Sequence, residues 1–131
     1  MGKDLALLII RIASALAFLY HGAGVLFAAF GGPGPAGFAG FTHTSLMVAY
    51  LVGLAQFCGG LAMLTGIFAR IGALCIAIVM VGAIDMVHLK HGFDIGRGGM
   101  EYALTQLLIA VAVLVAGAGK YSLAPKKIAN W

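Results

Sequence analysis

The sequence predicts an all-α membrane protein, built as an antiparallel bundle of four transmembrane helices with both termini in the cytoplasm. Hydrophobic residues make up 63% of the 131 residues and charged residues only 9%, which is too little polar surface to cover a soluble globule. The apolar residues fall into four long runs. Because these runs lack the alternation of a membrane-spanning strand, hydrogen-bond satisfaction in lipid favours helices over a barrel.

The predicted helices are separated by clusters of glycine and proline. In chain order they cover residues 5–30, 45–68, 71–90 and 101–118. Each run approaches or exceeds the ~17 apolar residues that cross a bilayer. Glycine and proline at 31–35 open an outer loop over 31–44, and glycine also marks the two later connections. Helices joined so briefly are expected to be antiparallel neighbours, so residues 1–131 form a single transmembrane domain.

The first run is expected to be a retained signal anchor, because it is too long for a cleavable signal and no polar domain follows a cleavage motif.

Basic residues set the expected orientation. Six of the eight lie on the side of the two termini, namely Lys3, Arg11, Arg70, Lys120, Lys126 and Lys127. Lys90 and Arg97 lie on the other side. The positive-inside bias therefore places both termini of this multi-pass protein in the cytoplasm. The positive charge is mainly a topology signal, and the chain lacks the soluble basic face of a nucleic-acid binder.

Two arginines and several aromatic residues are expected at the membrane boundaries. Long side chains there reach the interface, so we expect Arg11 and Arg70 to snorkel. The expected interfacial anchors are Tyr50, Tyr102, Tyr121 and Trp131.

Polar side chains inside the runs are the informative residues, because they are costly in lipid and normally face the bundle interior. The set comprises Tyr20, His21, Gln56, Asp85, His88 and Glu101. Counted at ~1.5 Å per residue from the middle of each run, they lie near the midplane or in the outer half. Asp85 and His88 are spaced i, i+3, so the carboxylate can orient the imidazole. We expect His21, Asp85, His88 and Glu101 to share one cavity, or else to be a purely structural network joining helices.

Electron carriers and metal sites are weakly indicated. Cys58 and Cys75 lie in apolar runs and form no Cys-x-x-Cys pair, and no covalent haem or flavin motif is present. Any electrons must therefore come from another subunit. His88 and His91 form an H-x-x-H pair, which suits zinc or copper but is common by chance.

Several blocks of the sequence together resemble the DoxX family. They are "FLYHG" at 18–22, "GGPGPAGFAGF" at 31–41, "LVGLAQFCGGLAMLTGIFAR" at 51–70, "VHLKHGF" at 87–93, "EYALTQLLIA" from 101 and "GAGKYSL" at 117–123. The resemblance covers nearly the whole chain and implies a small four-helix bacterial or archaeal membrane protein. By position, its polar residues correspond to Arg11, His21, Arg70, His88 and Glu101. One departure is Gln56, which stands where the family usually has glutamate.

The resemblance implies a link to redox chemistry, because family members are described as the membrane subunit of thiosulfate:quinone oxidoreductase or as anchors of stress-response complexes. The expected function is a quinone-interacting membrane subunit that passes electrons from a partner subunit to quinone. Tyr20, His21 and Gln56 would donate hydrogen bonds to the quinone, and Asp85, His88 and Glu101 would relay protons. The alternatives are a non-catalytic membrane anchor or assembly factor and a transition-metal-binding membrane protein. Small-residue faces also allow a homo-oligomer.

Overall fold

The computed structural model describes residues 1–128 and 131, and the regular secondary structure of this part of the chain is entirely helical, with no strand. Its long helices are α1 (Gly2–Phe27), α3 (Leu46–Thr65), α4 (Ala69–Ala83) and α5 (Glu101–Ala116). A short helix, α2 (Gly34–Thr42), lies between α1 and α3. The predicted all-α class is therefore confirmed, whereas the segment predicted as an outer loop contains a helix.

Short helical turns complete the backbone. A 3-10 turn, η1 (Ala29–Gly31), follows α1, and α4 continues into a π-helical turn, η2 (Ile84–His88). Two further 3-10 turns, η3 (Leu89–His91) and η4 (Ile95–Arg97), lead to α5. The π turn matters for the candidate site, because its wider winding changes which residues share a face of the helix.

Local chemistry explains several helix ends. The Ser45 hydroxyl accepts a hydrogen bond from Val48 N at 3.2 Å and so caps the start of α3. Gly66 ends α3 with φ of +80°, a left-handed conformation that glycine adopts without strain. Pro35 lies in the first turn of α2, where a missing N–H costs nothing.

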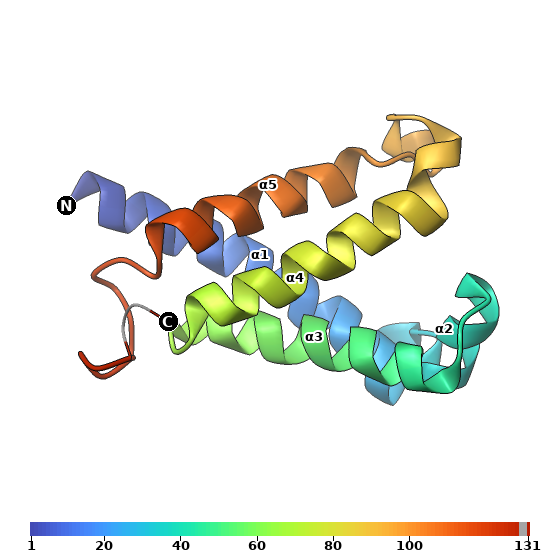
Figure 1. Ribbon diagram of the computed structural model, residues 1–131, viewed down its shortest axis with the longest axis horizontal. Helices are drawn as coiled ribbons and strands as arrows, with labels where there is room; N and C mark the ends of the chain where they lie inside the picture. Colours follow the sequence, from blue (N-terminus) through green and yellow to red (C-terminus); the bar gives the residue numbers. More distant parts are fainter. Residues whose placement is uncertain (129–130) are drawn as a thin grey trace.

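The long helices pack in chain order, α1 against α3, α3 against α4 and α4 against α5. The contact between α1 and α5 is much smaller. Figure 1 shows the two termini at one end of the bundle, and α2 with the α4–α5 connection at the other. We call these the terminal end and the α2 end. Asp4 accepts a hydrogen bond from Lys120 N at 3.0 Å, which ties the two chain ends together.

In the described part of the chain, three helices are long and apolar enough to cross a membrane, namely Gly2–Phe27, Leu46–Thr65 and the combined segment Ala69–His91. The fourth, α5, has 16 residues. At ~1.5 Å per residue it spans about 24 Å, less than the ~30 Å hydrocarbon core. The chain is thus a multi-pass membrane protein, and the crossing of the bilayer by α5 stays a prediction.

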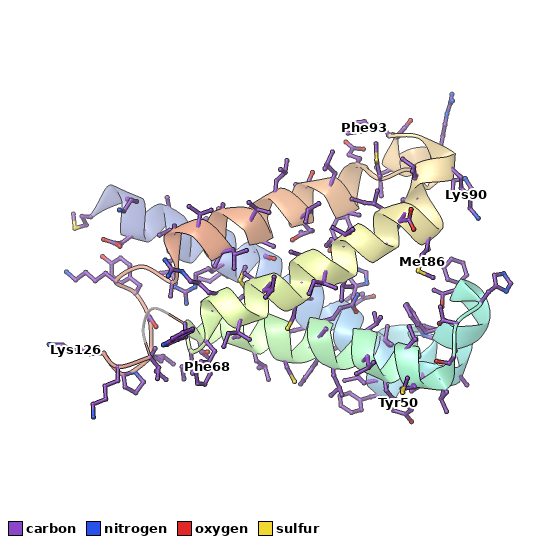
Figure 2. All side chains as sticks on the ribbon, in the orientation of Figure 1. Tyr50, Phe68, Met86, Lys90, Phe93 and Lys126 are labelled. Atoms are coloured by element: carbon purple, nitrogen blue, oxygen red, sulfur yellow. The ribbon has the colours of Figure 1, made fainter. Side chains whose placement is uncertain are left out.

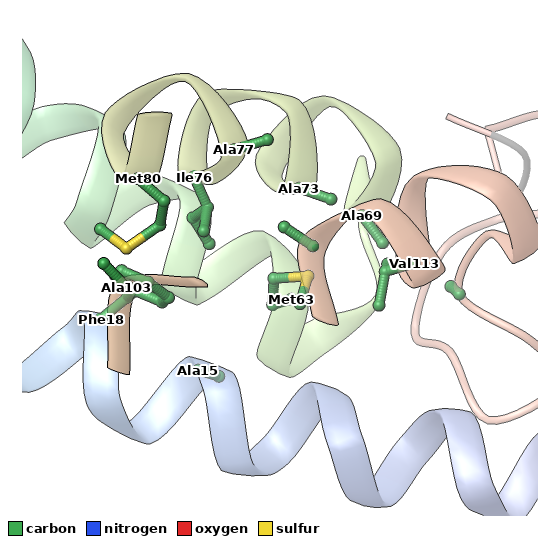
Figure 3. Packing of buried hydrophobic residues seen from close by; sticks show 12 residues of the cluster. Ala15, Phe18, Met63, Ala69, Ala73, Ile76, Ala77, Met80, Ala103 and Val113 are labelled. Atoms are coloured by element: carbon green, nitrogen blue, oxygen red, sulfur yellow. The ribbon is translucent and has the colours of Figure 1, made fainter. Parts of the chain in front are cut away.

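Small residues allow the helices to approach closely. The core contains Ala15 and Phe18 of α1, Met63 of α3, Ile76 of α4 and Val113 of α5, together with several alanines (Figure 3). Alanine and glycine at helix contacts are typical of bundles in lipid, where van der Waals packing replaces the hydrophobic effect. Gly59 is an example of this close packing, because an added Cβ there would lie 3.0 Å from Ile76 Cγ1.

Arg11 is fully buried, so the prediction that its side chain snorkels to the interface is wrong. Its guanidinium donates four hydrogen bonds to backbone carbonyls. The acceptors are Met63 O at 2.8 Å, Leu64 O at 3.2 Å, Ala118 O at 2.8 Å and Tyr121 O at 2.7 Å. The five N–H groups of arginine suit these carbonyls, which lie at the end of α3 and after α5. Arg11 therefore joins three parts of the chain at the terminal end.

Candidate functional site

A cavity of about 750 Å³ lies at the α2 end and is open to the exterior of the bundle. All four long helices contribute to its wall, and Phe38 and Phe41 of α2 also line it. Most of its lining is apolar, with Phe18, Val52 and Ile78 among the contributors. Both the size and the apolar character are typical of a small-molecule site, for which ~300 to 1,000 Å³ is usual.

Tyr20 and His21 of α1 both line the cavity. Their rings are 5.4 Å apart and nearly perpendicular. Tyr20 also stacks on Phe30 of η1, with ring centroids 5.0 Å apart. His21 is exposed within the open site, and its ring lies 5.9 Å from that of Tyr102 on α5. The adjacent tyrosine and histidine thus both line the cavity, as the sequence predicted.

Two buried polar atoms on the cavity lining have no hydrogen-bond partner among the described residues, Gln56 Oε1 and Tyr102 Oη. Gln56 is only 8% exposed and comes from α3. An unpaired buried polar atom costs ~1 to 3 kcal/mol, so such atoms usually meet water or a ligand. These two atoms are the strongest local indication that the cavity is built for a polar group.

Tyr102 was not predicted as a site residue, because the sequence placed it among the interfacial anchors. The structure brings it to the cavity, opposite His21. Its position directly after Glu101, at the start of a helix, was the available signal. A tyrosine there can face the bundle as readily as the interface, and only packing decides between the two.

His88 lines the cavity as predicted, but its partner differs from the one expected. Its Nδ1–H donates to the carbonyl of Gly98 at 2.8 Å. This bond orients the ring and leaves Nε2 as the proton acceptor of the neutral side chain. His88 lies in the π turn η2, where three residues no longer bring two side chains to one face. The predicted orientation of His88 by Asp85 is therefore not observed.

Asp85 and Glu101 do not line the cavity, so the expected convergence of all four ionisable residues is not observed. Asp85 is exposed on the π turn. Glu101 Oε1 accepts a hydrogen bond from Ile95 N at 3.1 Å and so holds the α4–α5 connection. The structure brings together Tyr20, His21, Gln56 and His88 of the predicted set and adds Tyr102. At the α2 end, the Glu101 carboxylate instead contacts the α4–α5 connection, and the Asp85 carboxylate is exposed.

Gln106 and Ser14 form a separate polar contact, with Ser14 Oγ donating to Gln106 Oε1 at 2.9 Å. Both residues are buried, and the bond joins α1 to α5 across their small interface. This interhelical pair is hydrogen-bonded within the protein and lies outside the set of residues predicted for the site.

Metal ligands do not gather in the described part of the chain. No group of three or more His, Cys, Asp or Glu side chains there is placed to hold a metal ion. The H-x-x-H pair, His88 and His91, divides between two surfaces, since His88 lines the cavity and His91 does not. Cys58 and Cys75 are both free thiols.

The fold and the site define the class of the protein as a multi-pass helical membrane protein with a ligand-sized apolar cavity between its helices. The sequence model of the DoxX family matches residues 6–89, which is more than half of the chain. The protein belongs to the DoxX family. The match includes α1 to α4 and both cavity histidines, but α5 and the two C-terminal blocks that carried part of the resemblance lie outside it. Neither the search of curated proteins nor that of solved structures gave a match.

Proposed function

We propose that this chain is the membrane subunit of a redox complex and passes electrons from a partner subunit to quinone. The observation that carries the proposal is the pair of unpartnered atoms, Gln56 Oε1 and Tyr102 Oη, in side chains that line an apolar cavity. A structural polar network would satisfy its members within the protein, as Arg11 and the Ser14–Gln106 pair do. Gln56 Oε1 and Tyr102 Oη, by contrast, have no such partner among the described residues.

The residues of the cavity fit the chemistry of a quinone headgroup. Its ring and isoprenoid tail require apolar walls, which the cavity supplies, and its two carbonyl oxygens require hydrogen-bond donors. The Tyr102 hydroxyl of α5 and the amide N–H of Gln56 on α3 can donate to these oxygens, and the unpartnered Gln56 Oε1 can accept from a hydroxyl of the reduced quinol. A bound quinone would supply a two-electron acceptor whose reduction takes up two protons.

Two histidines are placed to handle those protons. With Nδ1–H held by Gly98, His88 Nε2 can take up a proton from the open side of the cavity and then donate it to a reduced quinone oxygen, and His21, which lies beside Tyr102, can deliver the second proton in the same way. With two imidazoles at the cavity, this role does not require Asp85 or Glu101, which do not line it. Because the two cysteines are separate free thiols, the electrons would come from a redox group on a partner subunit.

The first test is thermal stabilisation of the purified protein by a short-chain quinone. We expect the melting temperature to rise with the logarithm of the quinone concentration, because the ligand binds the folded state. Tyr102→Phe should weaken binding about fivefold to tenfold, equivalent to ~1 to 1.5 kcal/mol for one hydrogen bond. The ligand-free melting temperature should not fall, because the variant removes a hydroxyl that has no partner. Circular dichroism melts in detergent measure both quantities.

Tyr50→Phe is the matched control, because Tyr50 is an exposed residue of α3 outside the cavity. It should leave the quinone response unchanged. His21→Ala should remove the response. A well-folded protein that no quinone stabilises would contradict the proposal and favour the alternative, a non-catalytic membrane anchor. That alternative is favoured by one observation, the absence of Asp85 and Glu101 from the cavity lining.

The proposal places the protein in a bacterial or archaeal cytoplasmic membrane with both termini inside. Figure 1 shows both termini at the terminal end, and Lys3 lies close to one terminus in the sequence and Lys120, Lys126 and Lys127 close to the other, which supports this orientation. In a variant with Cys58 and Cys75 replaced by alanine, Thr42→Cys should react with an impermeant maleimide in intact cells. Lys127→Cys should react only after lysis. The reverse labelling pattern would show that the α2 end faces the cytoplasm.

A further inference from the structure

A second, smaller pocket of about 430 Å³ lies at the α2 end, between the end of α2 and the last turns of the α4 segment. Three nitrogen-bearing side chains line it, His43, Lys90 and His91. Figure 2 shows Lys90 at this end of the bundle, with Met86 between the α4 segment and α2. The proposed quinone-binding residues Tyr20, His21, Gln56 and Tyr102 do not line this pocket, although Thr42 lines both it and the large cavity.

The charge at this pocket is uncompensated. Within the described chain, His43, Lys90 and His91 form no hydrogen bond or ion pair with their side chains, and no acidic side chain lines the pocket. Of the acids at this end, Asp94 accepts from Gly96 N at 2.8 Å and Glu101 from Ile95 N at 3.1 Å, and Asp85 is exposed on the π turn and does not line the pocket. The pocket therefore favours an anionic ligand.

The Thr42 hydroxyl, which also lines the pocket, already forms hydrogen bonds within the protein. It donates to Phe38 O at 2.9 Å and lies 2.8 Å from Thr44 Oγ1. Lys90 and the two imidazoles are thus the side chains left to receive the anion.

The surroundings favour an amphiphile over a free ion. The pocket shares Phe41, Met86 and Val87 with the apolar cavity, so a polar compartment passes directly into an apolar one. Lys90 and His91 end the membrane-spanning segment Ala69–His91, and this position corresponds to the level of the lipid phosphates. A volume of about 430 Å³ also exceeds what a single phosphate would fill.

We infer that this pocket binds the headgroup phosphate of an anionic phospholipid. Lys90 supplies the positive charge, and His43 and His91 supply N–H donors. An acyl chain of the lipid then follows Phe41 and Met86 along the edge of the large cavity.

The test is native mass spectrometry of the purified protein with an equimolar mixture of phosphatidylglycerol and phosphatidylcholine. We expect the wild type to retain phosphatidylglycerol preferentially. Lys90→Gln should lower this preference about fivefold, which converts the ~1 kcal/mol expected for one basic residue near anionic lipid. His43→Gln combined with His91→Gln should lower it further. Arg97→Gln is the matched control, because Arg97 is exposed at the same end and does not line the pocket.

Equal retention of the two lipids by the wild type would overturn the inference, as would an equal loss of preference in Lys90→Gln and Arg97→Gln. A further arm adds millimolar inorganic phosphate to the lipid mixture. Phosphatidylglycerol should stay bound. Its displacement would show that the pocket takes a soluble oxyanion, and the lipid assignment would then be wrong.

Discussion

Arg11→Ala is expected to prevent most of the protein from folding. Alanine would leave four backbone carbonyls, those of Met63, Leu64, Ala118 and Tyr121, without their donors. One unpaired buried acceptor costs ~1 to 3 kcal/mol, so a combined loss of at least about 3 to 5 kcal/mol is expected. A typical native protein has only ~5 to 15 kcal/mol of stability.

Two further effects act in the same direction. The carbonyls of Met63 and Leu64 belong to the last turn of α3, where a positive charge is favourable for the helix dipole. Gly66 follows them, and a Cβ there would lie 2.8 Å from Arg11 Nη2, so the turn is fitted closely around the guanidinium. The loss of Arg11 would also leave an empty space in this packed region.

Circular dichroism melts and size-exclusion chromatography in detergent measure the effect. Arg11→Lys should be intermediate, because an ammonium group keeps the charge but cannot reach four separate carbonyls. Arg97→Ala, which removes an exposed arginine, should melt like the wild type. If Arg11→Ala melts like Arg97→Ala, the four hydrogen bonds do not stabilise the bundle.

Arg11 also shows why the position of a side chain relative to the membrane interface is hard to predict from the sequence. Its distance from the end of the first run is compatible with snorkelling, and nothing in that run indicates acceptors for its side chain. Those acceptors come from residues 63–64 and from 118 and 121, so the contact depends on how the tail returns to α3. Two sequence features indicated backbone carbonyls that would need donors. One is Gly66, a typical helix end, and the other is the polar tail that follows the last apolar run.

The fold was more predictable than the site. Continuous apolar runs bounded by glycine and proline predict helices, because lipid leaves the backbone no other partner. The helix α2 was missed because glycine and proline usually mark loops, although Pro35 is well suited to a first helical turn. The observed α5 is shorter than the predicted 101–118, because Gly117 ends it with φ of +78°.

At the site, His21, Gln56 and His88 were predictable as polar residues that lipid would not tolerate. The absence of Asp85 and Glu101 from the cavity was not, because the prediction assumed a regular α-helix through residue 90. The π turn at Ile84–His88 changes the face on which each residue lies. A sequence with no proline or glycine between Ala83 and Lys90 gives no indication of that turn.

Gly22→Ala is expected to have the second-largest effect, because it would separate α1 from α3 beside the cavity. A Cβ at Gly22 would lie 2.6 Å from Phe57 N and 2.9 Å from Phe57 Cα. These are backbone atoms of α3, so no side-chain rotation relieves the clash. Overpacking of this kind typically costs ~1 to 3 kcal/mol.

Gly82→Ala is the matched control for this change. Gly82 is also helical, but nothing lies within 4 Å of a Cβ built there. The control should be neutral or more stable by up to about 1 kcal/mol, because alanine favours the helix. Melting both variants side by side by circular dichroism separates the clash from the general effect of replacing glycine. Equal melting temperatures would show that α1 and α3 are not in the close contact that the structure describes.

The same substitution links packing to the proposed function. His21 precedes Gly22, Gln56 precedes Phe57, and both polar residues line the cavity. A shift of α1 relative to α3 therefore changes the distance between His21 and Gln56, two of the residues that line the proposed quinone site. We expect Gly22→Ala to weaken the quinone-dependent rise in melting temperature, whereas Gly82→Ala should retain it even though Gly82 also lines the cavity. A full quinone response in destabilised Gly22→Ala would show that binding does not depend on the α1–α3 spacing, and would place the headgroup nearer to Tyr102 and His88.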